Sequence, residues 1–193
     1  TIAELSIQKL KAENQTLAQQ LQPHFLFNAL SVLKSLIQED ADLAEDYTVK
    51  LSDFLRYGVE SHQTDLVSLK EEMEFVNNYL SLQKIRFEEA IAFEVQISDN
   101  QLSGQVPIFA VQTLVENACK HNYFTEKRPL HISIETREDA LIVRNNLVSL
   151  KVTERAGTGL ANLSKRYEFL AGREIQIQQT ETDFSVTIPV IQS

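Results

Sequence analysis

The spacing of apolar residues changes near residue 91, and this change constrains the fold more than any other feature of the sequence. Before it, apolar residues recur every three or four positions, as they do along one face of an α-helix. After it, short segments such as IAFEVQI (91–97) and LHISIET (130–136) alternate apolar and polar residues, which is typical of half-buried strands. The sequence therefore predicts a helical first part followed by a part that mixes helices and strands.

The helical part predicts a coiled-coil segment and a helical hairpin. Residues 1–21 carry apolar or small side chains at heptad spacing, with Asn14 in the same series. A helix is expected over about 42–58, and another begins after Ser68, which forms a capping-box pattern with Glu71. The polar stretch ESHQTD (60–65) predicts a boundary, so the expected domains are residues 1–64 and 65–193.

The second part reads as β-α-β-β-α-β-β. A helix is expected within 106–122, with Pro107 near its first turn, and a second helix ends at Gly172. Helices interleaved with hairpin-linked strands predict a two-layer α/β sandwich. The expected fold class is α+β: a helical hairpin followed by such a sandwich.

Charge and composition exclude some kinds of protein. The formal net charge is −9 and the pI is about 5.0, which argues against a nucleic-acid binder. The single cysteine, Cys119, excludes an internal disulfide. No apolar run approaches the roughly 20 residues that a membrane-spanning helix needs. The chain begins at Thr1 in helical pattern, which suggests a fragment of a longer protein.

The segment QPHFLFNAL (22–30) places a histidine directly after a proline. On a helical wheel, His24 and Asn28 share a polar stripe with two serines, while most of the large apolar residues lie on the other side. Such a histidine is most often an ordinary surface residue. A neutral exposed imidazole is also a competent nucleophile, and its position alone leaves both interpretations open.

A second cluster lies in TLVENACKHN (113–122). Asn117, Lys120 and His121 are spaced so that they share one face of a helix. An asparagine oxygen suits Mg²⁺ and a lysine suits a phosphate, although a solvated helix edge would look the same.

A third cluster, AGTGLANLSKRY (156–167), places Gly157 and Gly159 where a helix opens. Backbone amides at a helix N-terminus bind anions, and glycines let a phosphate approach closely. An ordinary glycine turn is the alternative.

Together these segments resemble the cytoplasmic part of sensor histidine kinases of the LytS type, within the GHKL superfamily of ATP-binding proteins. QLQPHFLFNAL is similar to the phosphoacceptor box of that family, LVENACKH to its N-box and GTGLANLSKRY to its glycine box. LSDFLRY, YLSLQKIRF and FSVTIPV also resemble family segments, so the resemblance covers nearly the whole chain.

The resemblance implies a role for each matched residue. His24 would be the phosphoacceptor, Asn28 would assist dephosphorylation, and Asn117 would hold Mg²⁺ against the phosphates of ATP. The remaining nucleotide-binding residues would be Lys120, His121, Asn145, Gly157, Thr158, Gly159 and Leu160.

This sequence departs from the family pattern at three places. Asn145 replaces an aspartate that reads the adenine amine, and Leu147 replaces a glycine before the loop that covers the nucleotide. Phe25 replaces an acidic residue that takes the proton of the acceptor, which leaves Glu116 as the candidate base.

The expected function is that of a two-component sensor kinase, which phosphorylates its own histidine from ATP and passes the phosphoryl group to an aspartate. The implied partners are a second copy of the chain and the receiver domain of a response regulator, with no nucleic acid and no direct membrane contact in this fragment. The resemblance also implies that the chain is a cytoplasmic domain of an inner-membrane protein. A non-catalytic dimeric scaffold and an ATPase that drives a conformational clamp are the alternatives.

Overall fold

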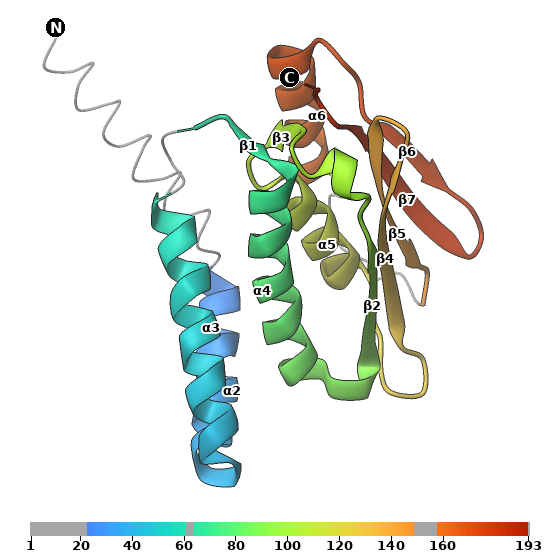
Figure 1. Ribbon diagram of the computed structural model, residues 1–193. Coiled ribbons are helices and arrows are strands. Elements are labelled where there is room, and N and C mark those ends of the chain that lie inside the picture. Colours follow the sequence, from blue (N-terminus) through green and yellow to red (C-terminus); the bar gives the residue numbers. More distant parts are fainter. Residues whose placement is uncertain (1–22, 61–63, 149–157, 193) are drawn as a thin grey trace, which may run out of the picture. The chain divides into compact units, whose positions relative to one another are not determined.

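The computed structural model describes residues 23–60, 64–148 and 158–192. The chain divides into two compact units, Thr1–Gln63 and Thr64–Ser193, and each is described by itself. The heptad segment 1–21, with Asn14, lies outside the described residues, as do His62 and Gly157. Figure 1 labels the helices and strands of both units.

The first unit is a helical hairpin, as the sequence predicts. Helix α2 (Pro23–Glu39) and helix α3 (Ala41–Glu60) pack against each other and turn at Asp40. The Asp40 carboxylate accepts a hydrogen bond from the backbone N–H of Leu43 at 3.0 Å, which satisfies an amide at the start of α3. Between the helices, the rings of Phe25 and Phe54 lie 4.9 Å apart, and Ala29, Tyr47 and Leu51 are buried beside them.

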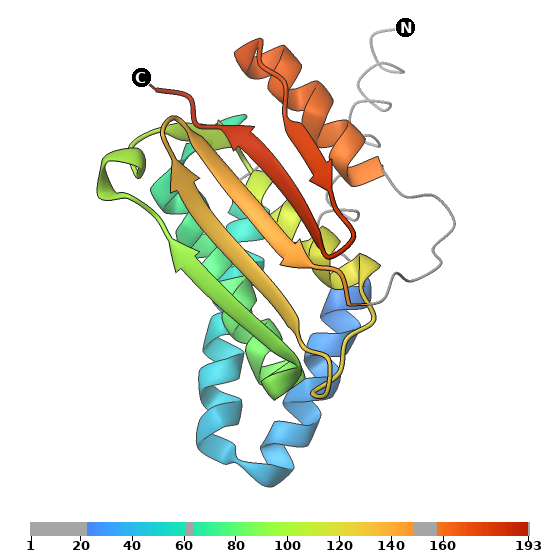
Figure 2. The ribbon, with the colours of Figure 1, turned by 90° about the vertical axis from the view of Figure 1, so that its right-hand side faces the viewer.

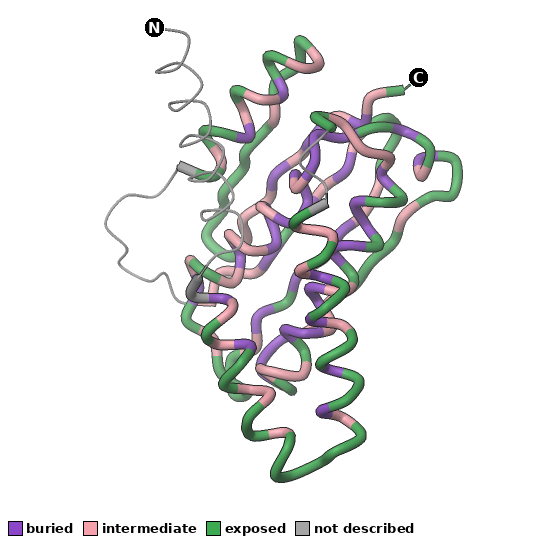
Figure 3. Tube along the Cα trace, turned by 90° about the vertical axis from the view of Figure 1, so that its left-hand side faces the viewer, coloured by how far each residue is buried: buried purple, intermediate pink, exposed green. Residues whose placement is uncertain are grey.

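This hairpin leaves many of its own apolar side chains uncovered. Phe27 is 70% exposed and Ile37 is 63% exposed, and Leu30, Val49 and Val59 are each about half exposed or more. Figure 3 shows long exposed stretches along both helices. Two helices cannot enclose a core of this width, whereas a bundle of four helices can.

The second unit contains seven strands and three α-helices among its described residues. Its helices are α4 (Leu69–Phe87), α5 (Ala110–His121) and α6 (Thr158–Ala171). A two-stranded antiparallel sheet pairs β1 (Leu66–Ser68) with β3 (Gln105–Pro107). The main sheet has the strand order β2-β4-β5-β7-β6, formed by Ile91–Gln96, Leu130–Arg137, Ala140–Asn146, Asp183–Pro189 and Gln176–Gln179. Strand β2 runs parallel to β4, and the other neighbours are antiparallel.

The helices cover one face of the main sheet and leave the other face open (Figures 1 and 2). Alternate residues of the central strands point into the core between the two layers, among them Ile132, Leu141, Val143 and Ile188. Helices α4 and α5 contact the sheet, and α6 packs against α5 and β3. The predicted two-layer α/β sandwich is therefore confirmed.

Two local predictions in this unit had different outcomes. The capping box is confirmed: the backbone N–H of Glu71 donates to the Ser68 hydroxyl at 3.2 Å, and the Glu71 carboxylate accepts from the Ser68 N–H at 3.0 Å. The expected start of the next helix at residue 106, with Pro107 near its first turn, is wrong. Pro107 ends β3 opposite Leu66, and α5 begins three residues later. The backbone of Phe109 is left-handed, with φ of 60°, and this turn separates the strand from the helix.

None of the helices in the described part of the chain is both long enough and apolar enough to cross a membrane.

Candidate functional site

Helix α5 presents three of the candidate residues on one side. Asn117, Lys120 and His121 follow one another at helical spacing in its last two turns, and none of the three is fully buried. The opposite side of α5 packs into the core through residues such as Val111, Leu114, Val115 and Ala118. The structure thus brings these three residues together, and Glu116 lies beside Asn117 in the same turn.

Asn145 lies near the end of β5 and faces the helical layer. It pairs with Ile132 of β4 and Phe184 of β7, and it is 4% exposed. Because α5 packs on β4 and β5, Asn145 lies on the face of the sheet that is covered by the helix carrying Asn117. Its side-chain amide donates a hydrogen bond to the backbone carbonyl of Asn146 at 2.8 Å. An aspartate could not make that bond.

The glycine box lies at the start of α6, and only part of it is described. Gly157 and the side chain of Thr158 lie outside the described residues, whereas Gly159 is exposed and Leu160 is half-buried. A methyl group added at Gly159 would meet only Thr113 of α5, at 3.6 Å, which is an ordinary contact. Packing against α5 therefore does not by itself require a glycine at this position.

His24 and Asn28 belong to the first unit, in the first turns of α2. The structure does not describe the side chain of His24, and Asn28 is half-buried. The candidates of α5, β5 and α6 all belong to the second unit.

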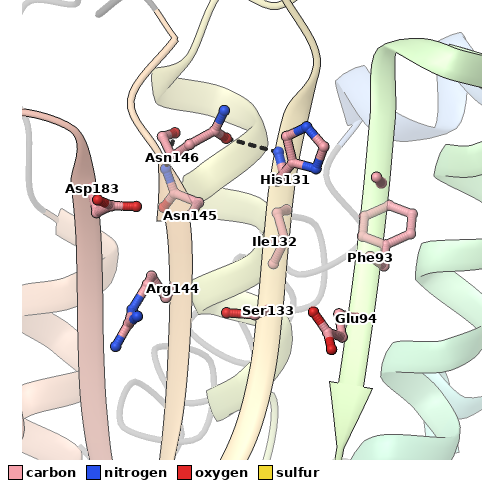
Figure 4. Close-up of a pocket in the computed structure, with 10 residues that line it drawn as sticks. Phe93, Glu94, His131, Ile132, Ser133, Arg144, Asn145, Asn146 and Asp183 are labelled. Atoms are coloured by element: carbon pink, nitrogen blue, oxygen red, sulfur yellow. Dashed lines mark hydrogen bonds between the residues drawn. The ribbon is translucent and has the colours of Figure 1, made fainter.

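A hollow of about 460 Å³ lies on the open face of the sheet, where β4 begins and β5 ends (Figure 4). Its polar lining comes from Glu94, His131, Ser133, Arg144, Asn145, Asn146 and Asp183. The Asn146 side chain spans the rim of the hollow. Its oxygen accepts a hydrogen bond from the backbone N–H of His131 at 2.7 Å, and its nitrogen donates to the backbone carbonyl of Pro129 at 3.0 Å. Asn145 is the one nucleotide candidate that borders the hollow, so the hollow is distinct from the cluster on α5.

Two further residues of this unit could not be assigned from the sequence, and the first is Asn122, which lies just after α5. It is 2% exposed, and its nitrogen donates to the Ala118 carbonyl at 2.9 Å. Its oxygen accepts from the backbone N–H of Val148 at 3.2 Å, so it joins the end of α5 to the segment after β5. An asparagine next to His121 gave no signal of this role, because the partner lies 26 positions away.

The second such residue is Glu72, a completely buried carboxylate on α4. Burial raises its pKa to about 7, and hydrogen bonds from the N–H groups of Gln112, Phe109 and Val111 act in the opposite direction. A signal was present, because Glu72 follows Leu69 by three positions and precedes Val76 by four, on the apolar side of the expected helix.

Comparisons with known proteins agree with the resemblance seen in the sequence. The profile of the family described as histidine kinase matches residues 12–91. The sensor protein LytS of Staphylococcus epidermidis is 31% identical over 209 residues, covering 97% of this chain and 35% of that protein. LytS of Streptococcus mutans is 31% identical over 194 residues, covering 92% of this chain and 33% of that protein. The sensor histidine kinase/phosphatase LytS of Staphylococcus aureus is 28% identical over 194 residues, covering 91% of this chain and 33% of that protein.

Solved histidine kinase structures are more distant. The catalytic domain of histidine kinase ThkA aligns over 67% of this chain and 100% of that one, with a TM-score of 0.46 and 16% identity. The Acinetobacter baumannii histidine kinase AdeS aligns over 94% of this chain and 97% of that one, with a TM-score of 0.43 and 17% identity. Likeness at this level carries no argument about the site.

The chain belongs to the histidine kinase family. Within that family it is similar, over nearly its whole length, to LytS sensor proteins. It spans about a third of the length of these curated relatives.

The side-chain bond of Asn145 leads to a prediction for Asn145→Asp. If this residue reads the adenine amine, a carboxylate makes a charge-assisted bond that is stronger by about 1–2 kcal/mol, or roughly 5- to 30-fold in affinity. The same change removes the bond to the Asn146 carbonyl and places a buried charge beside that oxygen. We therefore expect tighter ATP binding, measured by calorimetry with Mg²⁺, together with a lower melting temperature of the nucleotide-free protein.

Asn146→Asp is the matched control. It makes the same chemical change one residue along the strand, where the side chain bonds His131 and Pro129 instead. It should lower stability without tightening ATP binding. Unchanged affinity in Asn145→Asp would show that Asn145 does not read the base.

Proposed function

We propose that the chain is the kinase part of a two-component sensor protein. It would transfer the γ-phosphoryl group of ATP to His24 and then to an aspartate in the receiver domain of a response regulator. The observation that carries the proposal is the face of α5 on which Asn117, Lys120 and His121 lie together, on a helix that packs against α6 and against the sheet face of Asn145. The resemblance of α5 to the N-box and of α6 to the glycine box supports a nucleotide site formed by these two helices.

The residues of α5 are suited to the phosphate end of ATP. Mg²⁺ usually keeps several waters and is held by one or two protein oxygens together with substrate phosphates, so the single amide oxygen of Asn117 fits it. Across residues 23–60, 64–148 and 158–192, no three His, Cys, Asp or Glu side chains gather into a metal cage, so a site completed by the phosphates is the better match. When bound, the metal would neutralise charge on the phosphates. Lys120 would contribute a further positive charge there.

The chemistry at His24 is a displacement at phosphorus. A ring nitrogen of the neutral imidazole attacks the γ-phosphorus, and the bond to the oxygen that bridges the β- and γ-phosphates breaks, so ADP leaves with that electron pair. The N–H proton of the imidazole must pass to a base. Phe25, next in sequence, cannot take it, and we assign this role to Glu116 of α5. In the second reaction, an aspartate oxygen of the regulator attacks the phosphorus and the P–N bond breaks. Asn28, one turn after His24, is assigned to the removal of the phosphoryl group by water.

Labelling with γ-³²P ATP tests this function. A kinase retains label that acid releases and base does not, because phosphohistidine is labile in acid. A clamp ATPase releases labelled phosphate and retains none. A non-catalytic scaffold does neither. This second candidate function is favoured by one observation, the replacement of the family aspartate by Asn145.

We further propose that the chain is the cytoplasmic part of a membrane protein and that it acts as a homodimer. The exposed apolar residues of α2 and α3 are the surface that a second copy would cover. Neither nucleic acid nor direct membrane contact has a place in this proposal, given a net charge of −9.

The dimer can be tested by sedimentation. At micromolar concentration the wild-type protein should sediment as a dimer, and Ile37→Glu should shift it toward a monomer because a charge would enter the apolar interface. Phe169→Glu is the matched control, since Phe169 of α6 is 87% exposed and lies outside the hairpin. A wild-type monomer, or an equal effect of both variants, would contradict the proposed interface.

A further inference from the structure

Helix α5 begins without a cap of its own. The residue at its N-cap is Phe109, whose side chain cannot accept a hydrogen bond, and the first amides of a helix have no partners within it. These amides are also covered by protein, because Ala110, Val111 and Gln112 are buried. A helix start of this kind needs an acceptor from elsewhere in the fold.

Glu72 of α4 supplies that acceptor. One of its oxygens accepts from the Phe109 N–H at 2.9 Å. The other accepts from the N–H groups of Val111 at 2.9 Å and Gln112 at 3.3 Å. Both carboxylate oxygens are therefore engaged by the start of α5. The left-handed backbone of Phe109 is held by the same contact, because its N–H is one of the three donors.

Further contacts run along the same pair of helices, in the same order on both. Near the start, the rings of Phe75 and Phe109 lie 5.4 Å apart. Further along, Tyr79 is buried and its pKa is raised, first by desolvation and then by the nearby Cys119 and Glu116 of α5. At the last residue of α4 and just beyond the end of α5, the rings of Phe87 and Phe124 lie 4.9 Å apart. Helix α4 thus lies beside α5 (Figure 1), and Glu72 belongs to the first turn of α4.

The charge of Glu72 also acts on α6, the third helix that covers the sheet. Burial lowers the pKa of the Arg166 guanidinium on α6, and the negative charge of Glu72 acts against that shift. Tyr167, the next residue of α6, is buried, and its hydroxyl has no hydrogen-bond partner among the described residues. One carboxylate therefore acts on the start of α5 and on the helix that the glycine box opens.

We propose that Glu72 is a positioning residue for the nucleotide site, which sets the axial height of α5 and thereby the place of Asn117 and Lys120. The role rests on the proposed function. Asn117 follows Val111 by six residues, or about 9 Å along a helix, and a short helix moves as a stiff body. Any slip of α5 at its start therefore displaces the side chains that would hold Mg²⁺ and phosphate.

The test compares Glu72→Gln with Glu71→Gln. Glutamine keeps the shape of Glu72 but turns an NH₂ group toward at least one of the α5 amides, so the cap is broken on one side. Glu71 is the adjacent carboxylate and bonds only Ser68 in the capping box, where glutamine is tolerated. ATP affinity is measured by calorimetry on the full chain, with Mg²⁺ and again with EDTA, at mildly alkaline pH so that Glu72 is ionised.

Glu72→Gln should weaken Mg²⁺-ATP binding by about 10- to 100-fold, the loss that a displacement of about 1 Å can cause. In EDTA the loss should be smaller, because the metal contact of Asn117 is then absent and only the phosphate contact of Lys120 is displaced. Glu71→Gln should match the wild type under both conditions. Glu72→Asp, which keeps the charge but shortens the reach, should show a smaller loss of the same kind. If Glu72→Gln does not fold, Glu72→Asp is the variant that tests the positioning role.

Folded Glu72 variants that bind like the wild type would overturn the positioning role while leaving the proposed function intact. Losses of equal size with Mg²⁺ and with EDTA would overturn it as well, because they indicate a general structural effect. If the wild type itself binds no ATP, the proposed function is wrong and the positioning role falls with it.

Discussion

His24→Gln is expected to abolish the transfer of label from ATP to the protein, while leaving ATP affinity essentially unchanged. Glutamine has no ring nitrogen that can attack phosphorus. The residues assigned to ATP lie in the second unit, whereas His24 lies in α2 of the first, so the substitution leaves the nucleotide site intact. The measurement pairs labelling with γ-³²P ATP against calorimetry on the same preparation.

The other three histidines provide controls for this prediction. The chain contains four in all, and the remaining three are His62, His121 and His131. His131→Gln should label normally, since His131 is exposed on the open face of the sheet. If His24→Gln still carries acid-labile label, one of the three is the acceptor and the assignment of His24 is wrong. His62 is then the first to test, because it lies in the polar stretch between the two units.

The fold could be predicted because its signals are local. The change of period near residue 91 separates helices from strands, and Ser68 with Glu71 marks the start of α4 within four residues of sequence. Pro107 was misplaced because its environment is not local. It is a strand residue because Leu66, 41 positions earlier, pairs with it, and no helical or strand pattern over three residues could reveal that pairing.

The site could be predicted only in part, for the same reason. Asn117, Lys120 and His121 are neighbours on one helix, so their spacing in sequence already fixes their shared face. Glu72 acts on amides 37 to 40 positions away, and Asn122 acts on Val148 across the whole β4–β5 hairpin. Roles of this kind depend on tertiary packing and leave only an indirect trace in the sequence, such as a carboxylate on an apolar helix face.

The same limit applies to Asn145. From the sequence, its neutral amide is simply a weaker acceptor than the aspartate of the family pattern. In the structure, the amide nitrogen has a partner of its own, the carbonyl of Asn146. Asparagine therefore has a structural reason at this position in addition to any contact with adenine, which the sequence alone could not show.

Asn117→Ala is expected to reduce phosphorylation of His24 by on the order of 100-fold or more, since a metal at the phosphates supplies several kcal/mol of charge stabilisation. Alanine is the strongest helix former, and Asn117 is not fully buried, so α5 and the fold should be preserved. The loss is therefore one of chemistry and not of structure. It is measured as the initial rate of labelling over a series of Mg²⁺ concentrations.

Binding with and without metal identifies the cause of that loss. In EDTA, Asn117→Ala should bind ATP as the wild type does, because the amide then has no metal to hold, and the two proteins should differ only as Mg²⁺ is added. Asn77→Ala is the matched control: it makes the same substitution at an exposed position of α4 and should label at the wild-type rate. A wild-type rate in Asn117→Ala would remove the metal from this residue. An equal loss of affinity in EDTA would mean that the amide contacts the nucleotide directly, and Asn117 would then be a ligand of ATP and not of Mg²⁺.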